Sequence, residues 1–298
     1  MRHRAQSSLN LGLISSASFN LFGASLISRL VAEGRAPGLV LCAEKSRARK
    51  IRSYYKRNGL AATTRKIMEV KGMGGRRRGH IREQLAAYAE MHATDHWDLA
   101  LPALCDRHGI EYRTVASVNS ASTVDAVKRA GIDLMLNAGG EIIRAPLIGA
   151  TTHGVFNTHM GKLPEYRGFN VLEWSLFHGD PIGVTLHLID PGIDTGDIIR
   201  FQPVPHEPGD TVEALKAKCY PIDIDLMLWG IEKVEAGELP RTQQAPDGGK
   251  QYFAMHPRLR RIIERGLQAQ AGNEAAALDS PALFVVPQQG PGGDRRSA

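Results

Sequence analysis

An asparagine and a histidine stand one residue apart at the end of an apolar run, in the segment VFNTHMGKLPEYRGFN (155–170). Asn157 and His159 occupy positions i and i+2 of a predicted strand, so their side chains point to the same face. Gly161 and Pro164 then turn the chain away. An amide and an imidazole side by side at a strand end are typical of a reaction site, because both can donate a hydrogen bond to a developing negative charge.

Three aspartates follow in the segment LIDPGIDTGD (188–197), at positions 190, 194 and 197. A carboxylate within reach of His159 can hold an imidazolium and accept a proton through water. We expect Asp190 and Asp197 mainly to shape this loop, and His153, His178 and His187 to be structural or exposed. No Ser or Cys nucleophile stands at an elbow, no GxGxxG follows the first predicted strand, and the chain has no P-loop. The residues therefore favour proton transfer with oxyanion stabilisation over covalent hydrolysis or dinucleotide binding.

Strand-like and helical stretches alternate over the first 200 residues and must position these groups. The predicted strands lie at 9–15, 38–44, 111–117, 133–139 and 154–159. This alternation predicts an α/β fold, with a Rossmann-like, mostly parallel sheet flanked by helices and joined by right-handed crossovers. Ligands of such sheets bind at the carboxyl ends of the strands, where the segment 15–20, Gly139 and His159 all fall.

The pattern changes after residue 180, where two alternating runs at 182–190 and 198–206 predict a hairpin that closes the sheet edge. The stretch 211–237 predicts a helix that Pro221 interrupts and that ends at Gly237. We expect three regions: a catalytic domain over 1–210 with a helical basic insertion near 45–108, a C-terminal helical extension over 211–268, and a disordered tail over 269–298 that is rich in Gly, Pro, Ala and Gln.

The composition of the 298 residues, 43% hydrophobic and 23% charged, is ordinary for a globular protein. No apolar run approaches the ~20 residues that span a bilayer, and the N-terminus lacks a signal-peptide pattern, so we expect a cytoplasmic protein without membrane contact. The three cysteines are far apart and show no metal-ligand spacing. They predict buried reduced thiols, and no metal is expected.

The net charge of +6 is concentrated in two segments, EKSRARKIRSYYKR (44–57) and GRRRGH (75–80). One interpretation is a solvated, Arg-rich helix and loop inserted into the fold. The other is a surface that attracts an anionic substrate, such as a phosphate, a nucleotide or RNA. Little aromatic interleaving accompanies the basic residues, so the sequence does not favour a nucleic-acid platform.

Two segments carry a resemblance to a known family. NTHMGKLPEYRG (157–168) resembles the N-x-H-x-S-L-L-P-x-x-R-G motif of the folate-dependent formyltransferases, which include glycinamide ribonucleotide, methionyl-tRNA and sugar N-formyltransferases. IDPGIDTGDII (189–199) resembles the second signature of that family. The 35 residues from His159 to Asp194 match its spacing, and the resemblance covers residues 9–215.

The resemblance implies a formyltransferase fold and transfer of a formyl group from 10-formyltetrahydrofolate to an amine through a tetrahedral intermediate. Asn157 and His159 would polarise the formyl carbonyl and stabilise the oxyanion. Asp194 would keep His159 protonated and help remove a proton from the amine. The implied cofactor-binding residues are Asn137, Gly139, Gly140, Glu141, Ile142, Ile143 and Asp190. The implied substrate-binding residues are Ser18, Phe19, Asn20, Lys162 and Arg167.

The acceptor is less determined than the chemistry, because Gly161-Lys162 stands where the family has Ser-Leu. The methionyl-tRNA enzymes carry a second, β-barrel domain, and no run of regular short strands follows residue 215. Purine-pathway members have little beyond the motif region. We therefore expect a primary amine or hydroxylamine on a small molecule that could be anionic, such as an amino sugar or a hydroxyornithine-like amino acid. The oligomeric state stays open, and the alternatives are a 10-formyltetrahydrofolate hydrolase and a folate-binding module without transfer.

Overall fold

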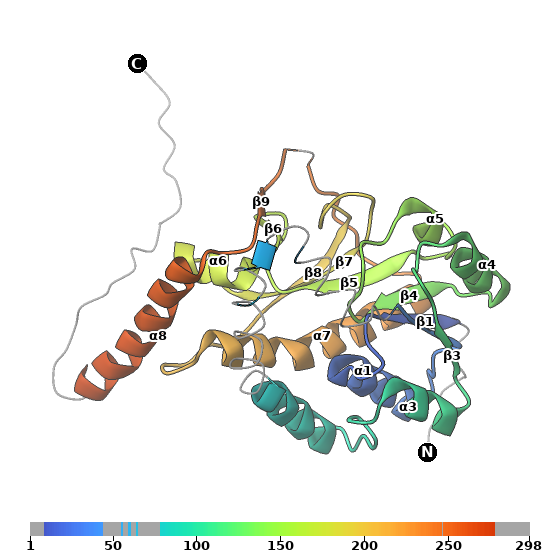
Figure 1. Ribbon diagram of the computed structural model, residues 1–298, viewed down its shortest axis with the longest axis horizontal. Coiled ribbons are helices and arrows are strands. Elements are labelled where there is room, and N and C mark those ends of the chain that lie inside the picture. Colours follow the sequence, from blue (N-terminus) through green and yellow to red (C-terminus); the bar gives the residue numbers. More distant parts are fainter. Residues whose placement is uncertain are drawn as a thin grey trace.

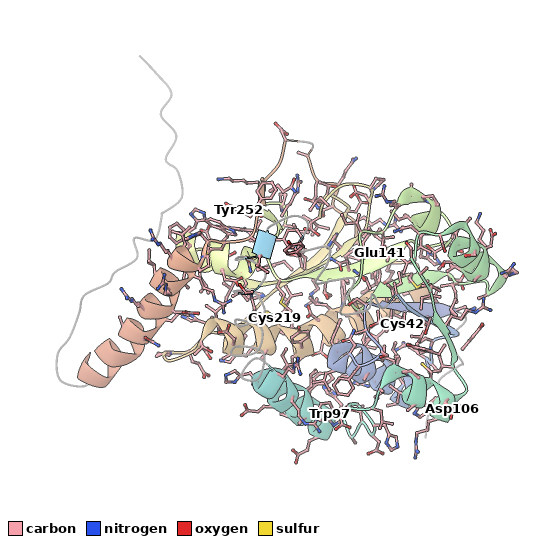
Figure 2. The ribbon with its side chains drawn as sticks, viewed as in Figure 1. Cys42, Trp97, Asp106, Glu141, Cys219 and Tyr252 are labelled. Carbon is pink, nitrogen blue, oxygen red and sulfur yellow. The ribbon has the colours of Figure 1, made fainter. Side chains whose placement is uncertain are left out.

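The computed structural model describes residues 9–43, 55, 59–60, 64, 78–245 and 247–277, with side chains up to 269. Most of the two basic segments, and with them part of the predicted insertion, lies outside the described residues. Within the described part of the chain, no helix is both long and apolar enough to cross a membrane. Cys42, Cys105 and Cys219 are buried, as predicted, and form no disulfide within the described part of the chain; Figure 2 shows Cys42 and Cys219 inside the fold.

Seven strands form the central sheet of the molecule (Figure 1). In chain order they are β1 (Leu11–Ser15), β2 (Leu39–Cys42), β3 (Glu111–Thr114), β4 (Leu134–Asn137), β5 (Val155–His159), β7 (Gly183–Leu188) and β8 (Ile198–Pro203). Across the sheet the order is β3-β2-β1-β4-β5-β7-β8. The first five strands are parallel to one another. β7 runs antiparallel to β5, and β8 runs antiparallel to β7. The predicted mostly parallel sheet with a hairpin at its edge is confirmed.

Helices cover both faces of this sheet, and each face has its own apolar core. One face carries α1 (Leu21–Ala32), a helix over 78–91, α3 (Leu101–His108) and α7 (Val212–Glu235). The other carries α4 (Ala121–Arg129) and α5 (Ala145–Ile148). Neighbouring strand residues alternate between the two cores, because successive side chains of a strand point in opposite directions. Leu13 enters the first core and Ile14 the second.

Helix α7 does not break at Pro221, and this corrects the expected interruption. Proline removes the hydrogen bond to the carbonyl of Ala217, which normally kinks or ends a helix. Here both sides of the proline are buried against the sheet, as at Ala217, Ile224 and Met227. This packing outweighs the lost bond, and the helix ends near Gly237, which adopts a φ of +69°.

A small second sheet joins the C-terminal part of the chain to the region after β5. It pairs β6 (Tyr166–Gly168) with β9 (Lys250–Tyr252), and the helices α6 (Val171–His178) and α8 (Pro257–Ala277) flank it (Figure 1). The C-terminal extension, predicted as helical, therefore also contains a strand. The last helix continues to Ala277, past the predicted start of the tail, and residues 278–298 lie outside the described part of the chain.

We call residues 242–245 and 247–252 the strap, because they run from the sheet edge to the second sheet. Thr242 exchanges two backbone hydrogen bonds with Ile198, the first residue of β8. At its other end the strap becomes β9 and pairs with β6, and the backbone N–H of Lys250 also bonds the carbonyl of Glu165. The strap thus lies beside the loop that follows β7.

Candidate active site

Strand β5 brings Asn157 and His159 to the carboxyl end of the sheet, on the same face as predicted. Phe156 and Thr158 alternate to the opposite face, where Phe156 enters the core against α7. His159 is 7% exposed, so its ring is held largely inside the protein. One strand therefore contributes core packing through one face and reactive groups through the other.

His159 and Asp194 lie together although 35 residues separate them in the sequence. Nδ1 of His159 is 3.5 Å from Oδ2 of Asp194, and Nε2 donates a hydrogen bond of 2.7 Å to the carbonyl of Tyr166. The same carboxylate oxygen accepts the backbone N–H of Gly168 at 2.9 Å. Asp194 has a φ of +53°, a conformation uncommon outside glycine. A strained loop thus directs its carboxylate at the histidine.

A second histidine, His187, joins this group. The sequence predicted it to be structural or exposed, and the structure shows it buried beside Asn157. The register of β5 and β7 places it directly opposite Asn157. Its Nδ1 donates to the carbonyl of Leu188 at 2.8 Å, and its Nε2 lies 2.9 Å from Nδ2 of Asn157. Burial, reinforced by the nearby charge of His159, lowers the pKa of His187 to about 4. At neutral pH its Nε2 therefore accepts a hydrogen bond from the Asn157 amide.

The Asn157 amide is oriented from both ends. Its Oδ1 accepts a hydrogen bond of 2.8 Å from Nδ2 of Asn137, whose own Oδ1 accepts the N–H of Gly139 at 3.2 Å. An amide nitrogen carries two hydrogens, and His187 takes one of them. The second N–H of Asn157 can therefore donate to a substrate. Thr185 and His187 alternate along β7, so the sequence could have predicted that they share a face of the strand. It could not have predicted that this face lies beside the site, because that depends on the pairing of β7 with β5.

Of the predicted cofactor residues after β4, some hold their loop in place, and Ile142 has an exposed apolar side chain. Glu141 accepts the backbone N–H of Val118 at 2.6 Å, and Ile143 is buried in the second core. Gly139 adopts a φ of +97°, and a side chain at Gly140 would lie 3.4 Å from Ile14. Ile142 is 62% exposed beside this loop, so its side chain is available to cover a ligand.

Asp190 and Asp197 shape the loop between β7 and β8. Oδ1 of Asp190 accepts the Thr195 hydroxyl at 2.6 Å and the N–H of Gly192 at 3.1 Å. The carbonyl of Asp197 accepts the N–H of Leu188 at the end of β7. These contacts turn the chain so that Asp194, between them, faces His159.

The predicted acceptor residues of the first loop have different surroundings. Asn20 caps α1 through Gly23, and its amide donates to the carbonyl of Ala138 at 2.8 Å and to Ser15 at 3.0 Å. Asn20 therefore ties the first loop to the loop after β4. The carbonyl of Ser18 accepts the N–H of Leu101, whereas Phe19 is 57% exposed.

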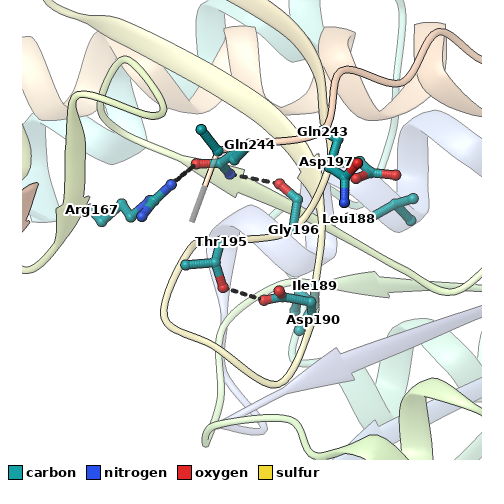
Figure 3. A pocket seen from close by; sticks show the side chains of 10 residues that line it. Arg167, Leu188, Ile189, Asp190, Thr195, Gly196, Asp197, Gln243 and Gln244 are labelled. Atoms are coloured by element: carbon teal, nitrogen blue, oxygen red, sulfur yellow. Dashed lines mark hydrogen bonds between the residues drawn. The ribbon is translucent and has the colours of Figure 1, made fainter. Parts of the chain in front are cut away.

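Lys162 and Arg167, also predicted to bind substrate, differ in exposure. Nζ of Lys162 lies at the surface, 2.8 Å from Glu165. Arg167 is buried, and its Nε and Nη2 donate to Oε1 of Gln244 at 3.0 and 2.7 Å. Figure 3 shows this pair beside a cavity of about 400 Å³. The cavity is lined by Arg167, Leu188, Ile189, Asp190, Thr195, Gly196, Asp197, Gln243, Gln244 and Ala245. Gln244 belongs to neither sequence motif, and no pattern of residue types along the chain points to it.

Residues 52–227, more than half of the chain, match the family model described as formyl transferase. The chain belongs to the formyl transferase family. Methionyl-tRNA formyltransferase of Geobacter sulfurreducens is 30% identical over 144 residues, which are 48% of this chain and 45% of that protein. The chain thus spans about half the length of the curated relatives that it matches.

Two solved structures show the same fold. Glycinamide ribonucleotide transformylase 1 from Symbiobacterium toebii is 19% identical, with a TM-score of 0.51 over 80% of this chain and 92% of that chain. WlaRD, a sugar 3N-formyl transferase solved in the presence of dTDP and 5-N-formyl-THF, is 15% identical, with a TM-score of 0.50 over 82% of this chain and 69% of that chain. The predicted family and fold are confirmed.

Proposed function

We propose that this chain transfers the formyl group of 10-formyltetrahydrofolate to an amine of a small molecule. The observation that carries the proposal is the meeting of Asn157, His159 and Asp194 at the end of β5 in a member of the formyl transferase family. This set can donate to a developing oxyanion and accept a proton without a covalent enzyme intermediate. No step requires a metal.

Asn157 would donate its second N–H to the formyl oxygen as negative charge develops there. His187 and Asn137 hold the amide in this orientation before the reaction, so little reorganisation is needed in the transition state. His159 and Asp194 would act on the attacking amine. Their separation of 3.5 Å is long for a direct hydrogen bond, and one water or amine beside the pair could hydrogen-bond to both Nδ1 and the carboxylate.

The loop after β4 offers features that fit a folate. Ile142 presents exposed apolar surface in the loop that follows Asn137, and Asn137 is bonded to Asn157. An apolar surface and polar amides on neighbouring segments suit a planar heterocycle with polar edges. When bound, 10-formyltetrahydrofolate would supply the activated formyl group. The remaining loop residues would hold the ring in place through Gly139, Gly140 and the Asp190 turn. The similar fold of WlaRD, solved with 5-N-formyl-THF, supports this assignment.

For the acceptor we propose an amino sugar or a hydroxylated amino acid, with Phe19 and Lys162 as exposed contacts at the site mouth. Support comes from the likeness in fold to a sugar 3N-formyl transferase. A second candidate is an aminoacyl-tRNA. It is favoured by the 30% identity to a methionyl-tRNA formyltransferase and by the net charge of +6.

The test is release of tetrahydrofolate from 10-formyltetrahydrofolate, followed by absorbance, with nucleotide-linked amino sugars, N-hydroxylated amino acids, methionyl-tRNA or no acceptor. Release with one acceptor class, together with its formylated product in the mass spectrum, would establish the transferase and its substrate. Release without any acceptor would indicate a hydrolase instead. Folate binding without release would indicate a binding module, and absence of both would overturn the proposal.

A further inference from the structure

We infer that Gln244 is a positioning residue that holds the Asp194 loop so that its carboxylate faces His159. The inference rests on the proposed function for its kinetic consequence, but the contacts that it concerns are structural. Gln244 lies in the strap, beyond the residues 52–227 that match the family model. Its side chain is 9% exposed and connects two segments of the site.

The hydrogen bonds of Gln244 use the full capacity of its amide. Oε1 accepts two bonds from Arg167, and Nε2 donates to the carbonyls of Asp194 at 3.0 Å and of Gly196 at 2.6 Å. Figure 3 shows the contacts of Gln244 with Arg167 and Gly196. The orientation is unambiguous, since a guanidinium can only donate and a carbonyl can only accept. One side chain therefore links β6 to two backbone positions of the catalytic loop.

The Asp194 loop needs such support because its backbone is strained. Asp194 has a φ of +53°, and non-glycine residues keep this conformation only where their surroundings enforce it. Gln244 holds the Asp194 carbonyl, while the N–H of Gly168, the residue after Arg167, holds the Asp194 carboxylate. Gln244 thus fixes the main chain of Asp194, and Gly168 fixes its side chain.

The strap can carry this role because it is anchored on both sides of Gln244. Thr242 exchanges backbone hydrogen bonds of 2.9 and 2.8 Å with Ile198, and β9 pairs with β6. The residue therefore sits on a segment that is fixed to the sheet and to the residues after β5. Movement of the strap would move the Asp194 loop with it.

A purely structural role would be to accept the hydrogen bonds of the buried Arg167, and Gln244→Glu separates this role from the positioning of Asp194. Glutamate keeps oxygens toward the guanidinium and adds an opposite charge, so Arg167 stays paired. It lacks both N–H donors and places an oxygen against the carbonyls of Asp194 and Gly196. Gln268→Glu makes the same chemical change on α8, at an exposed side chain that does not line the cavity, and serves as the matched control.

The experiment compares these variants, Asp194→Asn and the double variant Asp194→Asn/Gln244→Glu by kinetics, thermal unfolding and hydrogen exchange. We expect Gln244→Glu to lower kcat by ~10- to 100-fold, with KM for 10-formyltetrahydrofolate within about threefold and the unfolding temperature retained. Amide exchange over 190–197 should rise. Gln268→Glu should match the wild type, and Gln244→Glu should add no loss in the Asp194→Asn background, because it acts through that residue.

Normal kcat in Gln244→Glu, losses that multiply in the double variant, or unchanged exchange over 190–197 would overturn the inference. Hydrogen exchange needs no acceptor, so it tests the positioning role even if the wild type shows no turnover with any amine, a result that would count against the proposed function alone. Should Gln244→Glu fail to fold, Arg167→Lys provides the second variant. It removes one of the two bonds to Oε1, and unchanged exchange and unchanged kcat in that variant would likewise overturn the inference.

Discussion

At the scale of single residues, Asn157 can serve as an oxyanion donor because its neighbours decide which way its amide points. His187 contributes through its neutral state, since an unprotonated Nε2 accepts from Asn157 whereas an imidazolium would repel that N–H. Asp194 contributes through an unusual backbone conformation that aims its carboxylate at His159. Each reactive group therefore depends on a partner outside the sequence motif that contains it.

Asp194→Asn should keep folate binding and lose most transfer. The asparagine oxygen can still accept the N–H of Gly168, so the loop keeps its place, but an amide cannot take a proton from the attacking amine. We expect kcat to fall by ~10²- to 10⁴-fold, measured by tetrahydrofolate release. Tetrahydrofolate affinity, measured by fluorescence titration, is the control. Near-wild-type turnover would show that Asp194 has no role in proton transfer.

His187 predicts a loss of stability on the acid side of neutrality. Its folded-state pKa is about 4, against an ordinary value of 6.5, so the unfolded chain binds this proton first as the pH falls. The free energy of unfolding should decline between pH 6.5 and 4 by up to ~3 kcal/mol from this residue. His187→Gln, which cannot titrate, should show a shallower decline in urea unfolding at pH 7 and 5. Parallel declines in the two proteins would contradict the assignment.

At the scale of elements, β5 connects the site to the helix beneath it. Its reactive face carries Asn157 and His159, and its other face meets α7, where Asp223 is buried and bonded to Thr158. Oδ1 of Asp223 has no hydrogen-bond partner within the described residues. Burial raises the pKa of this carboxyl to about 8, and the bond to Thr158 offsets only part of the effect. Asp223 is therefore neutral in the folded protein at pH 7.

Asp223→Asn should stabilise the protein increasingly as the pH rises. The unfolded carboxyl ionises near pH 3.8 and the folded one near 8. Between these pH values, loss of the proton lowers the free energy of the unfolded wild type and so lowers its stability. The asparagine variant has no carboxyl to ionise at this position, so it does not lose stability in this way. We expect a gain on the order of 5 kcal/mol at pH 8 and little difference at pH 4, measured by chemical denaturation. An equal difference at both pH values would refute the buried neutral carboxyl.

The strap also depends on a glycine at its turn into β9. Gly249 has a φ of +74°, and a Cβ there would lie 1.6 Å from the carbonyl oxygen of Pro164. Gly249→Ala should therefore displace the strap and lower the unfolding free energy by ~1–3 kcal/mol. Because the strap carries Gln244, kcat should fall as well. Gly266→Ala, in the open on α8, is the matched control and should be neutral or stabilising. Unchanged stability of Gly249→Ala would show that the strap is not tightly held.

At the scale of the whole molecule, charged side chains join the C-terminal helix to the rest of the fold. Arg260 of α8 pairs with Glu213 of α7 and with Glu264, and its Nη1 lies 4.0 Å from Glu173. Glu173 is fully buried in α6 and also pairs with Lys216. Three helices thus meet around one buried carboxylate, and they stand on the same side as the second sheet that carries the strap.

Arg260→Met should loosen α8 from the molecule. Methionine keeps apolar bulk but leaves Glu213 and Glu173 with less positive charge in partly buried surroundings. We expect a loss of ~1–3 kcal/mol in unfolding free energy and faster amide exchange in α6 and α8. The double variant Arg260→Met/Glu213→Leu, which removes both charges, should recover part of the loss. If the double variant recovers no stability, Arg260 contributes through its packing and not through its charge.

Much of the fold and part of the site could be predicted because they depend on local patterns. Strands β1, β2, β4 and β5 carry apolar runs, Gly237 ends α7, and the β7–β8 hairpin follows from alternation. The common face of Asn157 and His159 follows from the geometry of a single strand. The continuity of α7 through Pro221 could not be predicted, since it depends on the packing of that helix against the sheet.

The sequence by itself determined the α/β class, the residue pair at the end of β5 and, through two motifs, the family. Only the tertiary structure decided that His187 lies opposite Asn157, that Arg167 is turned inward, and that Gln244 spans the Asp194 loop. The physical reason is that these contacts join residues 30 to 77 positions apart. Strand register and the path of the strap set such distances, and neither is encoded in the local spacing of residue types.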